Sequence, residues 1–153
     1  MPGPGAYIAD PTEGISRPED LPRPRVVERS RSYKRRACPR CGHSAYRDKV
    51  FRRILHDLGE GGRPKDVHLT YSQHCCTPCG SYFPAHTEDL APPGARYTRS
   101  VVELAVRLVA EDGLPYRTAS WHLWRDHRVF VPFATIQNWV EAAGEKRGRS
   151  RPR

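Results

Sequence analysis

Apolar residues recur with a helical period only in the last third of the chain. From residue 101 onward they are spaced at i, i+3, i+4, i+7 and i+8, which places them on one face of an α-helix. Similar one-sided stretches begin near Pro115 and Pro132, and Gly113 and Gly144 stand where the first and last stretches end. Proline in a first turn and glycine after a last turn are typical helix boundaries. The pattern predicts three short helices over residues 98–144.

The region before these helices predicts strands. Apolar and polar residues alternate loosely over residues 46–54 and 67–71, and the glycine-rich block 59–64 lies between the two stretches. Alternation on both sides of a turn-forming block is typical of paired β-strands. We therefore expect two short strands joined by a long glycine-rich loop within residues 37–90.

The remaining segments read as connections and tails. Residues 1–36 contain six of the 15 prolines and few large apolar side chains, which predicts a disordered leader. Residues 91–97, with the sequence APPGARY, predict a linker between two modules. Residues 145–153 form a basic tail.

Two short cysteine motifs provide the sharpest chemical signal. The chain reads CPRCG from Cys38 to Gly42 and CTPCG from Cys76 to Gly80. Two residues between thiols let both sulfurs of a tight turn face one ion, and the following glycine permits the positive φ that such a turn needs. Two turns of this kind supply four thiolates, which is the ligand set of a closed structural zinc site. The predicted metal ligands are Cys38, Cys41, Cys76 and Cys79, and the predicted cofactor is Zn²⁺.

Several alternatives stay open for this site. Cys75 is adjacent to Cys76 and offers a competing thiol, although Cys76 keeps the two-residue spacing to Cys79. His74 or His86 can replace a thiolate, and unligated thiols or a redox pair are a further interpretation. Five cysteines without a recognisable secretory signal argue against a disulfide framework and favour a reducing cytoplasm.

Charge and composition narrow the function. The 153 residues carry a formal net charge of +9, with +3 on residues 1–37 and +4 on residues 144–153. Basic arms beside near-neutral modules suit a polyanion such as nucleic acid, although they can also serve solubility alone. No apolar run reaches membrane-spanning length. The acidic residues form no recognisable motif and a closed four-thiolate site has no open position for water, so we expect neither an enzyme nor a small-molecule substrate.

The third predicted helix offers a surface for reading DNA. In VPFATIQNWVEAAG, the apolar residues would face the core, and Thr135, Gln137 and Asn138 would face outward. Amide side chains pair with adenine in the major groove, and threonine contacts phosphate or a thymine methyl. We expect the tail residues Arg147, Arg149, Arg151 and Arg153 to track phosphates. An ordinary three-helix bundle with a solvated polar face is the alternative.

These features together predict a small α+β fold. In this prediction a zinc ribbon, consisting of a short β-hairpin with a four-cysteine site, precedes a three-helix helix-turn-helix, with disordered tails at both ends. Residues 38–144 resemble the front part of bacterial insertion-sequence transposases, through the CPxCG and CxxCG turns and the later segments GLPYR and TIQNW. The resemblance implies zinc binding by the four cysteines and base contacts from Thr135, Gln137 and Asn138.

The resemblance also implies a function and its limits. Family members bind the terminal inverted repeats of a mobile element and continue into a catalytic domain, for which this chain leaves no room. We therefore expect a sequence-specific duplex DNA-binding protein of the nucleoid, either an orphan or truncated transposase or an element-encoded repressor. Its expected partners are double-stranded DNA, a second copy of itself or a separately encoded catalytic subunit. The alternatives are a zinc-ribbon adaptor that docks on protein, a regulator unrelated to transposition, or an RNA-binding protein.

Overall fold

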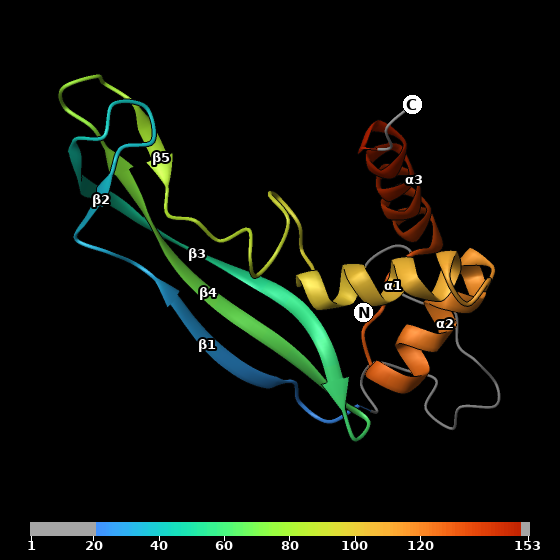
Figure 1. Cartoon of the computed structure of the whole chain (residues 1–153). Coiled ribbons are helices and arrows are strands. Elements are labelled where there is room, and N and C mark those ends of the chain that lie inside the picture. The colour runs from blue at the N-terminus through green and yellow to red at the C-terminus, as the bar shows by residue number, and fades with distance from the viewer. Residues whose placement is uncertain (1–20, 151–153) are drawn as a thin grey trace.

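A long curved sheet extends away from a compact group of three helices (Figure 1). The computed structural model describes residues 21–150, with side chains up to Glu145. The strands are β1 (Arg25–Arg31), β2 (Arg35–Ala37), β3 (Ser44–Glu60), β4 (Arg63–Cys75) and β5 (Tyr82–Pro84). The helices are α1 (Arg99–Ala110), α2 (Tyr116–His127) and α3 (Phe133–Ser150). We call residues 21–84 the arm, residues 85–97 the strap and residues 98–150 the helical unit.

Strands β3 and β4 run along the whole length of the arm. They pair antiparallel from Tyr46 and Cys75 at the far end, which we call the tip, to Glu60 and Arg63 beside the helices. The turn between them consists only of Gly61 and Gly62, whose φ angles are +59° and +76°. Two-residue hairpin turns with positive φ at both positions match the twist of the flanking strands, and glycine adopts them without steric cost. The glycine-rich block is therefore a tight turn.

The predicted fold class is wrong. The sheet has five strands in the order β1-β4-β3-β2, with β5 also paired to β4, and it mixes parallel and antiparallel neighbours. Its two longest strands have 17 and 13 residues. A strand-rich α+β arrangement of this kind does not fit a short-hairpin zinc ribbon followed by a helix-turn-helix. The 34 residues between Cys41 and Cys76, which we expected to contain a long loop, instead form a long hairpin.

Strand β1 lies within the segment 1–36 for which the sequence predicts disorder. It runs parallel to β4, so that Val27 lies beside Val67 and Arg29 beside Leu69. The last leader prolines, Pro22 and Pro24, precede the strand and therefore leave its hydrogen bonding intact. Residues 1–20 of the predicted leader lie outside the described residues.

The chain then crosses one face of the sheet at the tip. The backbone N–H of Tyr33 donates to Ser72 Oγ at 3.1 Å, and the N–H of Arg47 donates to the carbonyl of Lys34 at 3.0 Å. This crossing helps to bury Ser72 and His74 completely on a face of the sheet that is otherwise open. It also brings the chain to the far edge of β3, where β2 pairs and the first cysteine turn begins.

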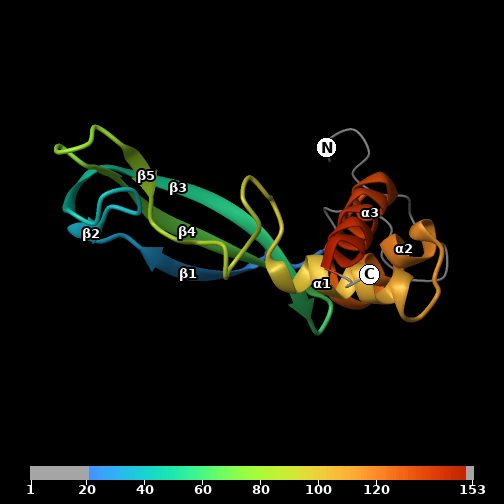
Figure 2. The same cartoon turned by 45° about the horizontal axis from the view of Figure 1, so that its top comes forward.

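The strap returns along the opposite face of the sheet toward the helices (Figures 1 and 2). Ala91 packs on Leu55, Val67 and Leu69, and all four side chains are buried. Close to the helices, the N–H of His56 donates to the carbonyl of Arg96 at 2.8 Å. Residues 91–97, expected to be a linker, are therefore packed on the sheet over part of their length.

The helical unit has its own core. Its three helices lie in the three segments where the apolar period predicts them. The fully buried members of the core include Val101, Leu123 and Ile136, one from each helix. Gly113, with a φ of +72°, follows the end of α1, and α3 continues past Gly144 to Ser150, further than predicted. Tyr97 of the strap joins this core, because its ring meets Trp139 edge-on and its hydroxyl donates to the carbonyl of Phe130 at 2.9 Å.

Candidate metal centre and basic arm

Two matching turns at the tip present the cysteine motifs. In the first turn, Gly42 N–H donates to the carbonyl of Cys38 at 2.8 Å, and Gly42 has a φ of +79°. In the second turn, Gly80 N–H donates to the carbonyl of Cys76 at 2.7 Å, and Gly80 has a φ of +72°. The first turn links β2 to β3 and the second links β4 to β5. Sheet pairing therefore holds the two turns face to face.

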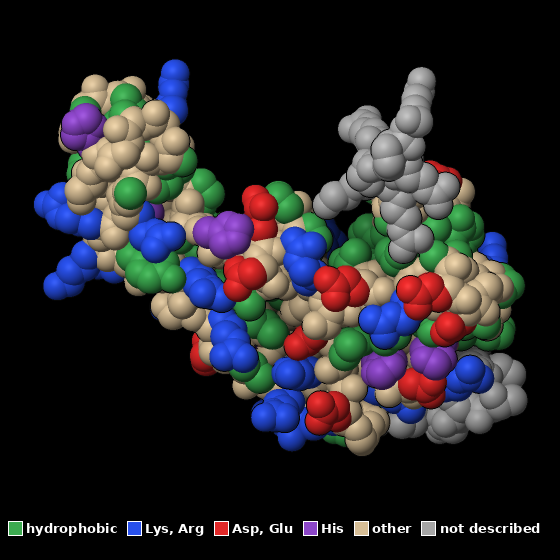
Figure 3. Space-filling model, viewed as in Figure 1, with side chains coloured by type: hydrophobic (Ala, Val, Ile, Leu, Met, Phe, Trp, Pro, Cys, Tyr) green, Lys and Arg blue, Asp and Glu red, His purple; other side chains and the backbone are tan. Residues whose placement is uncertain are grey.

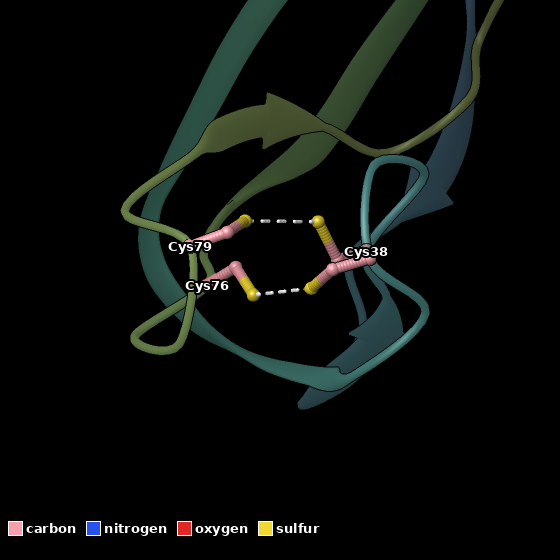
Figure 4. A group of neighbouring side chains, drawn as sticks. Cys38, Cys76 and Cys79 are labelled. Carbon is pink, nitrogen blue, oxygen red and sulfur yellow. Dashed lines mark hydrogen bonds between the residues drawn. The ribbon is translucent and has the colours of Figure 1, made fainter.

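The four predicted thiols converge between these turns. Cys38 Sγ lies 3.7 Å from Cys79 Sγ, and Cys41 Sγ lies 3.4 Å from Cys76 Sγ (Figure 4). All four sulfurs lie within 4.8 Å of one another. Cys38 and Cys76 are buried, and Cys41 and Cys79 are exposed. The four side chains lie close enough to bind one metal ion.

The pKa values of Cys76 and Cys79 shift in opposite directions. Ser81 hydrogen-bonds to Cys79 through its hydroxyl and its backbone, and this lowers the pKa of Cys79 to about 6. For Cys76, the backbone of Cys79 lowers the pKa, but burial and the neighbouring thiols outweigh it and raise the pKa of Cys76 to about 12. A cysteine binds a metal ion as its thiolate, so metal binding would release the proton of Cys76.

Other residues near the site have separate roles. Cys75 is buried but does not belong to the cluster of four sulfurs. Its side chain hydrogen-bonds to Tyr46 and Tyr82 and raises the pKa of both phenols. His74, an alternative ligand in the sequence analysis, lies 2.7 Å from Ser72 Oγ through Nε2 and stacks on Phe83. The other alternative, His86, lies 4.0 Å from Asp89.

The residues predicted to read DNA lie on α3. Asn138 is exposed, and Thr135 and Gln137 are half-buried. Gln137 Nε2 donates to Glu141 Oε1 at 3.1 Å, so its amide is already engaged within the helix. Arg147 and Arg149 fall on the last turns of α3, beyond the described side chains, and Arg151 and Arg153 lie outside the described residues.

The net positive charge of the described chain is concentrated on the arm. The arm holds 14 Lys and Arg against 5 Asp and Glu, whereas the helical unit holds 8 against 6. Lys and Arg side chains are spread along the β1 side of the arm from the tip toward the helices (Figure 3). From the sequence, most of the charge was expected in the two tails. The arm was not recognised because the acidic first 20 residues cancel much of the basic segment 21–37 when both are counted together.

Two further findings concern the apolar character of the helices and the comparison with known proteins. Among the described residues, none of the helices combines the length and apolar character needed to cross a bilayer. In comparisons with protein-family models, curated protein sequences and solved structures, nothing matches this chain.

Proposed function

We propose that the four thiolates hold a zinc ion that clamps the tip of the arm. Tetrahedral coordination with Zn–S bonds of about 2.3 Å requires sulfurs about 3.8 Å apart. The separations of 3.4 Å and 3.7 Å across the two turns are close to this requirement. An all-thiolate set favours Zn²⁺ over the hard cations that prefer oxygen ligands. Zinc would join two turns that are distant in sequence and make the tip rigid.

Metal analysis of the purified protein tests this proposal. We expect one zinc per chain, retained in Cys75→Ser and lost or greatly weakened in Cys76→Ser. The two variants remove adjacent buried thiols, so a general effect of losing a buried cysteine would appear in both. Retention of zinc by Cys76→Ser, or its loss from Cys75→Ser alone, would contradict the ligand assignment.

We infer that the chain binds duplex DNA through the arm. The observation that carries this proposal is the charge contrast between the arm, with a formal net charge of +9, and the helical unit, with a formal net charge of +2. Phosphates therefore attract the arm more strongly than they attract the helical unit. Arg25 and Arg29 of β1 are exposed, and alternation along the strand places them on one face of the sheet. We assign them as phosphate contacts.

The salt dependence of binding tests the role of the arm. The double variant Arg25→Gln/Arg29→Gln removes two charges from β1, and Arg107→Gln/Arg117→Gln removes two exposed charges from the helical unit. For a mixed-sequence duplex, we expect the first variant to reduce the slope of log K against log salt by up to about one unit per lost phosphate contact. We expect the second variant to leave the slope unchanged. The opposite order, or no binding at low salt, would reject this function.

Base reading by α3 is the finer part of the proposal. Asn138 is the exposed amide on this helix, whereas the amide of Gln137 is bonded to Glu141. We expect selection from a random duplex pool to yield a preferred sequence, and Asn138→Ala to relax the preference by about 1–3 kcal/mol at one position. Glu145→Gln on the same helix is the control. Enrichment of inverted repeats from mobile elements would support the narrower expectation of transposon ends.

A further inference from the structure

A groove beside the tip carries features that the metal site and the basic edge do not use. It has a volume of about 760 Å³ and lies between the sheet and the segment that runs from β5 into the strap. The register of β3 and β4 places Phe51, Arg53, Tyr71 and Gln73 on the face of the sheet that lines it. Arg36 and Phe83 contribute from β2 and β5.

Aromatic rings on the sheet face of the groove remain partly open to solvent. Phe51 is 39% exposed although it lies mid-strand on the face that carries the sheet core. Its ring centroid lies 5.7 Å from that of Tyr71, with the planes tilted by 35°. Aromatic side chains that stay open to solvent inside a concave site, beside charged and amide side chains, are typical of binding surfaces, and such rings stack readily on planar ligands.

Two arginines give the groove a positive charge. The Arg53 guanidinium lies 5.9 Å from the centroid of the Tyr71 ring, and within the described part of the chain its buried Nε atom has no hydrogen-bond partner. Arg36 also lines the groove, and among the described residues Glu88 is the one carboxylate that does so. A buried donor without an acceptor costs free energy, which an oxygen-bearing ligand would recover.

We propose that this groove binds an unpaired nucleotide of the DNA held by the arm. The base stacks on Phe51 and Tyr71, the amide of Gln73 meets its edge, and Arg36 and Arg53 face its phosphate. A paired base presents no free ring face to such a platform, so the ligand is single-stranded at that position. The inference rests on the proposed DNA binding, because the arm is what brings a strand to the groove.

The test compares two probes that differ only in an unpaired extension. One is a blunt duplex, and the other is the same duplex with a three-nucleotide single-stranded end that carries 2-aminopurine, whose fluorescence falls when it stacks. With the zinc-loaded full chain, we expect the extension to raise affinity about tenfold and the emission to be quenched on binding. Free oligothymidine is a third probe, and it tests whether the groove binds a single strand when no duplex is present.

Paired variants on neighbouring residues isolate the groove. Phe51→Leu removes the ring but keeps an apolar side chain, and we expect it to abolish the quenching and most of the tenfold gain. Ile54→Ala, which trims an exposed apolar residue on the opposite face, leaves both unchanged. Arg53→Gln reduces the gain from the extension, whereas Arg52→Gln removes the same charge from the opposite face and does not. Metal content and the circular dichroism of each variant verify folding.

The outcomes separate this inference from the proposed function. Blunt-duplex binding with no gain from the extension overturns the groove assignment and leaves the arm function intact. Binding of oligothymidine, sensitive to Phe51→Leu, without any duplex binding supports the groove and rejects the arm function. An equal gain in Phe51→Leu and the wild-type protein overturns the stacking role. An excess of acidic peptide is the last competitor. If it displaces neither probe, the groove is not a peptide site. If it displaces the single-stranded extension, the nucleotide assignment is overturned.

Discussion

Gly59 occupies the contact between the arm and the helical unit. A Cβ atom at this position would lie 2.2 Å from the carbonyl oxygen of Arg63 and 2.6 Å from that of His127. Both neighbours are backbone atoms, so neither can move without disturbing the hairpin or the end of α2. Any larger residue would clash with backbone here, so the contact between the arm and the helical unit requires glycine at position 59.

Gly59→Ala tests this contact. We expect a loss of at least about 2 kcal/mol in the free energy of unfolding, because overpacking against fixed backbone has to displace one element. Gly144→Ala is the matched control, since a Cβ there meets no atom of another described residue within 4 Å and the residue lies inside α3. It should stabilise by about 0.5–1 kcal/mol, as alanine does in a helix. Urea unfolding followed by circular dichroism measures both, and equal effects would contradict the packing argument.

His127, at the same contact, makes stability depend on pH. Burial lowers its pKa below the ordinary 6.5, the charge of nearby His122 lowers it further, and Asp126 and the backbone of Gly59 oppose the shift. The unfolded chain therefore binds this proton at a higher pH than the folded chain. Stability is full above about pH 6.5 and falls as the pH decreases toward the lowered pKa.

The variant His127→Gln should remove this part of the pH dependence. We expect the difference in melting temperature between wild type and variant to change between pH 8 and pH 5.5, with the wild type losing more. His68→Gln, on the open face of the arm, controls for the loss of a histidine that is half exposed. A pH-independent difference for His127→Gln would show that its protonation is not linked to folding.

For single residues, the local spacing of side chains along the sequence predicted the cluster of four cysteines correctly, whereas contacts between residues distant in sequence could not be predicted. The four cysteines could be predicted because two residues between thiols fix a turn, whatever the rest of the chain does. The groove could not be predicted, because Phe51, Tyr71 and Phe83 come from three strands whose register is not visible in the sequence. Likewise, nothing in the segment TIQNW shows that Gln137 is bonded to Glu141.

The β3–β4 hairpin shows why element lengths were harder to predict than element positions. The turn was located correctly at the glycine-rich block, but the strands beside it were expected to be short. Along β3, Val50 and Ile54 face solvent on the open side of the sheet. On the covered side, Arg53 stands where regular alternation would place an apolar residue. Apolar alternation is therefore weak over much of a strand that is continuous in backbone pairing. Strand β1 was missed because its parallel partner lies 40 residues away.

Substitutions in the turn test whether this hairpin sets the geometry of the arm. Gly61→Asn should be neutral or slightly stabilising, because asparagine tolerates positive φ and is favoured before glycine in such turns. Gly61→Val should cost about 1–2 kcal/mol, since a β-branched residue is strained at a φ of +59°. Among the described residues, no atom beyond the glycine and its two chain neighbours lies within 4 Å of a Cβ at this position, so packing does not confuse the comparison. Equal stabilities of the two variants by urea unfolding would reject the assigned turn.

On the scale of the whole molecule, the metal centre and the helical core lie at opposite ends (Figures 1 and 2). At the tip, the buried apolar cluster of described residues consists of Cys38, Ala45 and Cys76, with Phe83 packed against it. So small an apolar cluster stabilises little without a bound ion. Over the residues whose side chains are described, the helical core has eight buried members from all three helices and the connection between the last two, and none of them is a predicted ligand of the metal site.

Removal of the metal should therefore open one end of the molecule and leave the other folded. We expect a strong chelator to raise amide hydrogen exchange over residues 35–47 and 72–84, while the amides of α1 and α2 stay protected. All three tryptophans, Trp121, Trp124 and Trp139, lie in the helical unit, so their fluorescence should not change on chelation. Cys75→Ser, which keeps the four ligands, should respond as the wild type does. A simultaneous loss of tryptophan signal and helix protection would show that the tip and the helices unfold as one cooperative unit. Unchanged exchange at the tip would mean that the sheet alone holds the cysteine turns together.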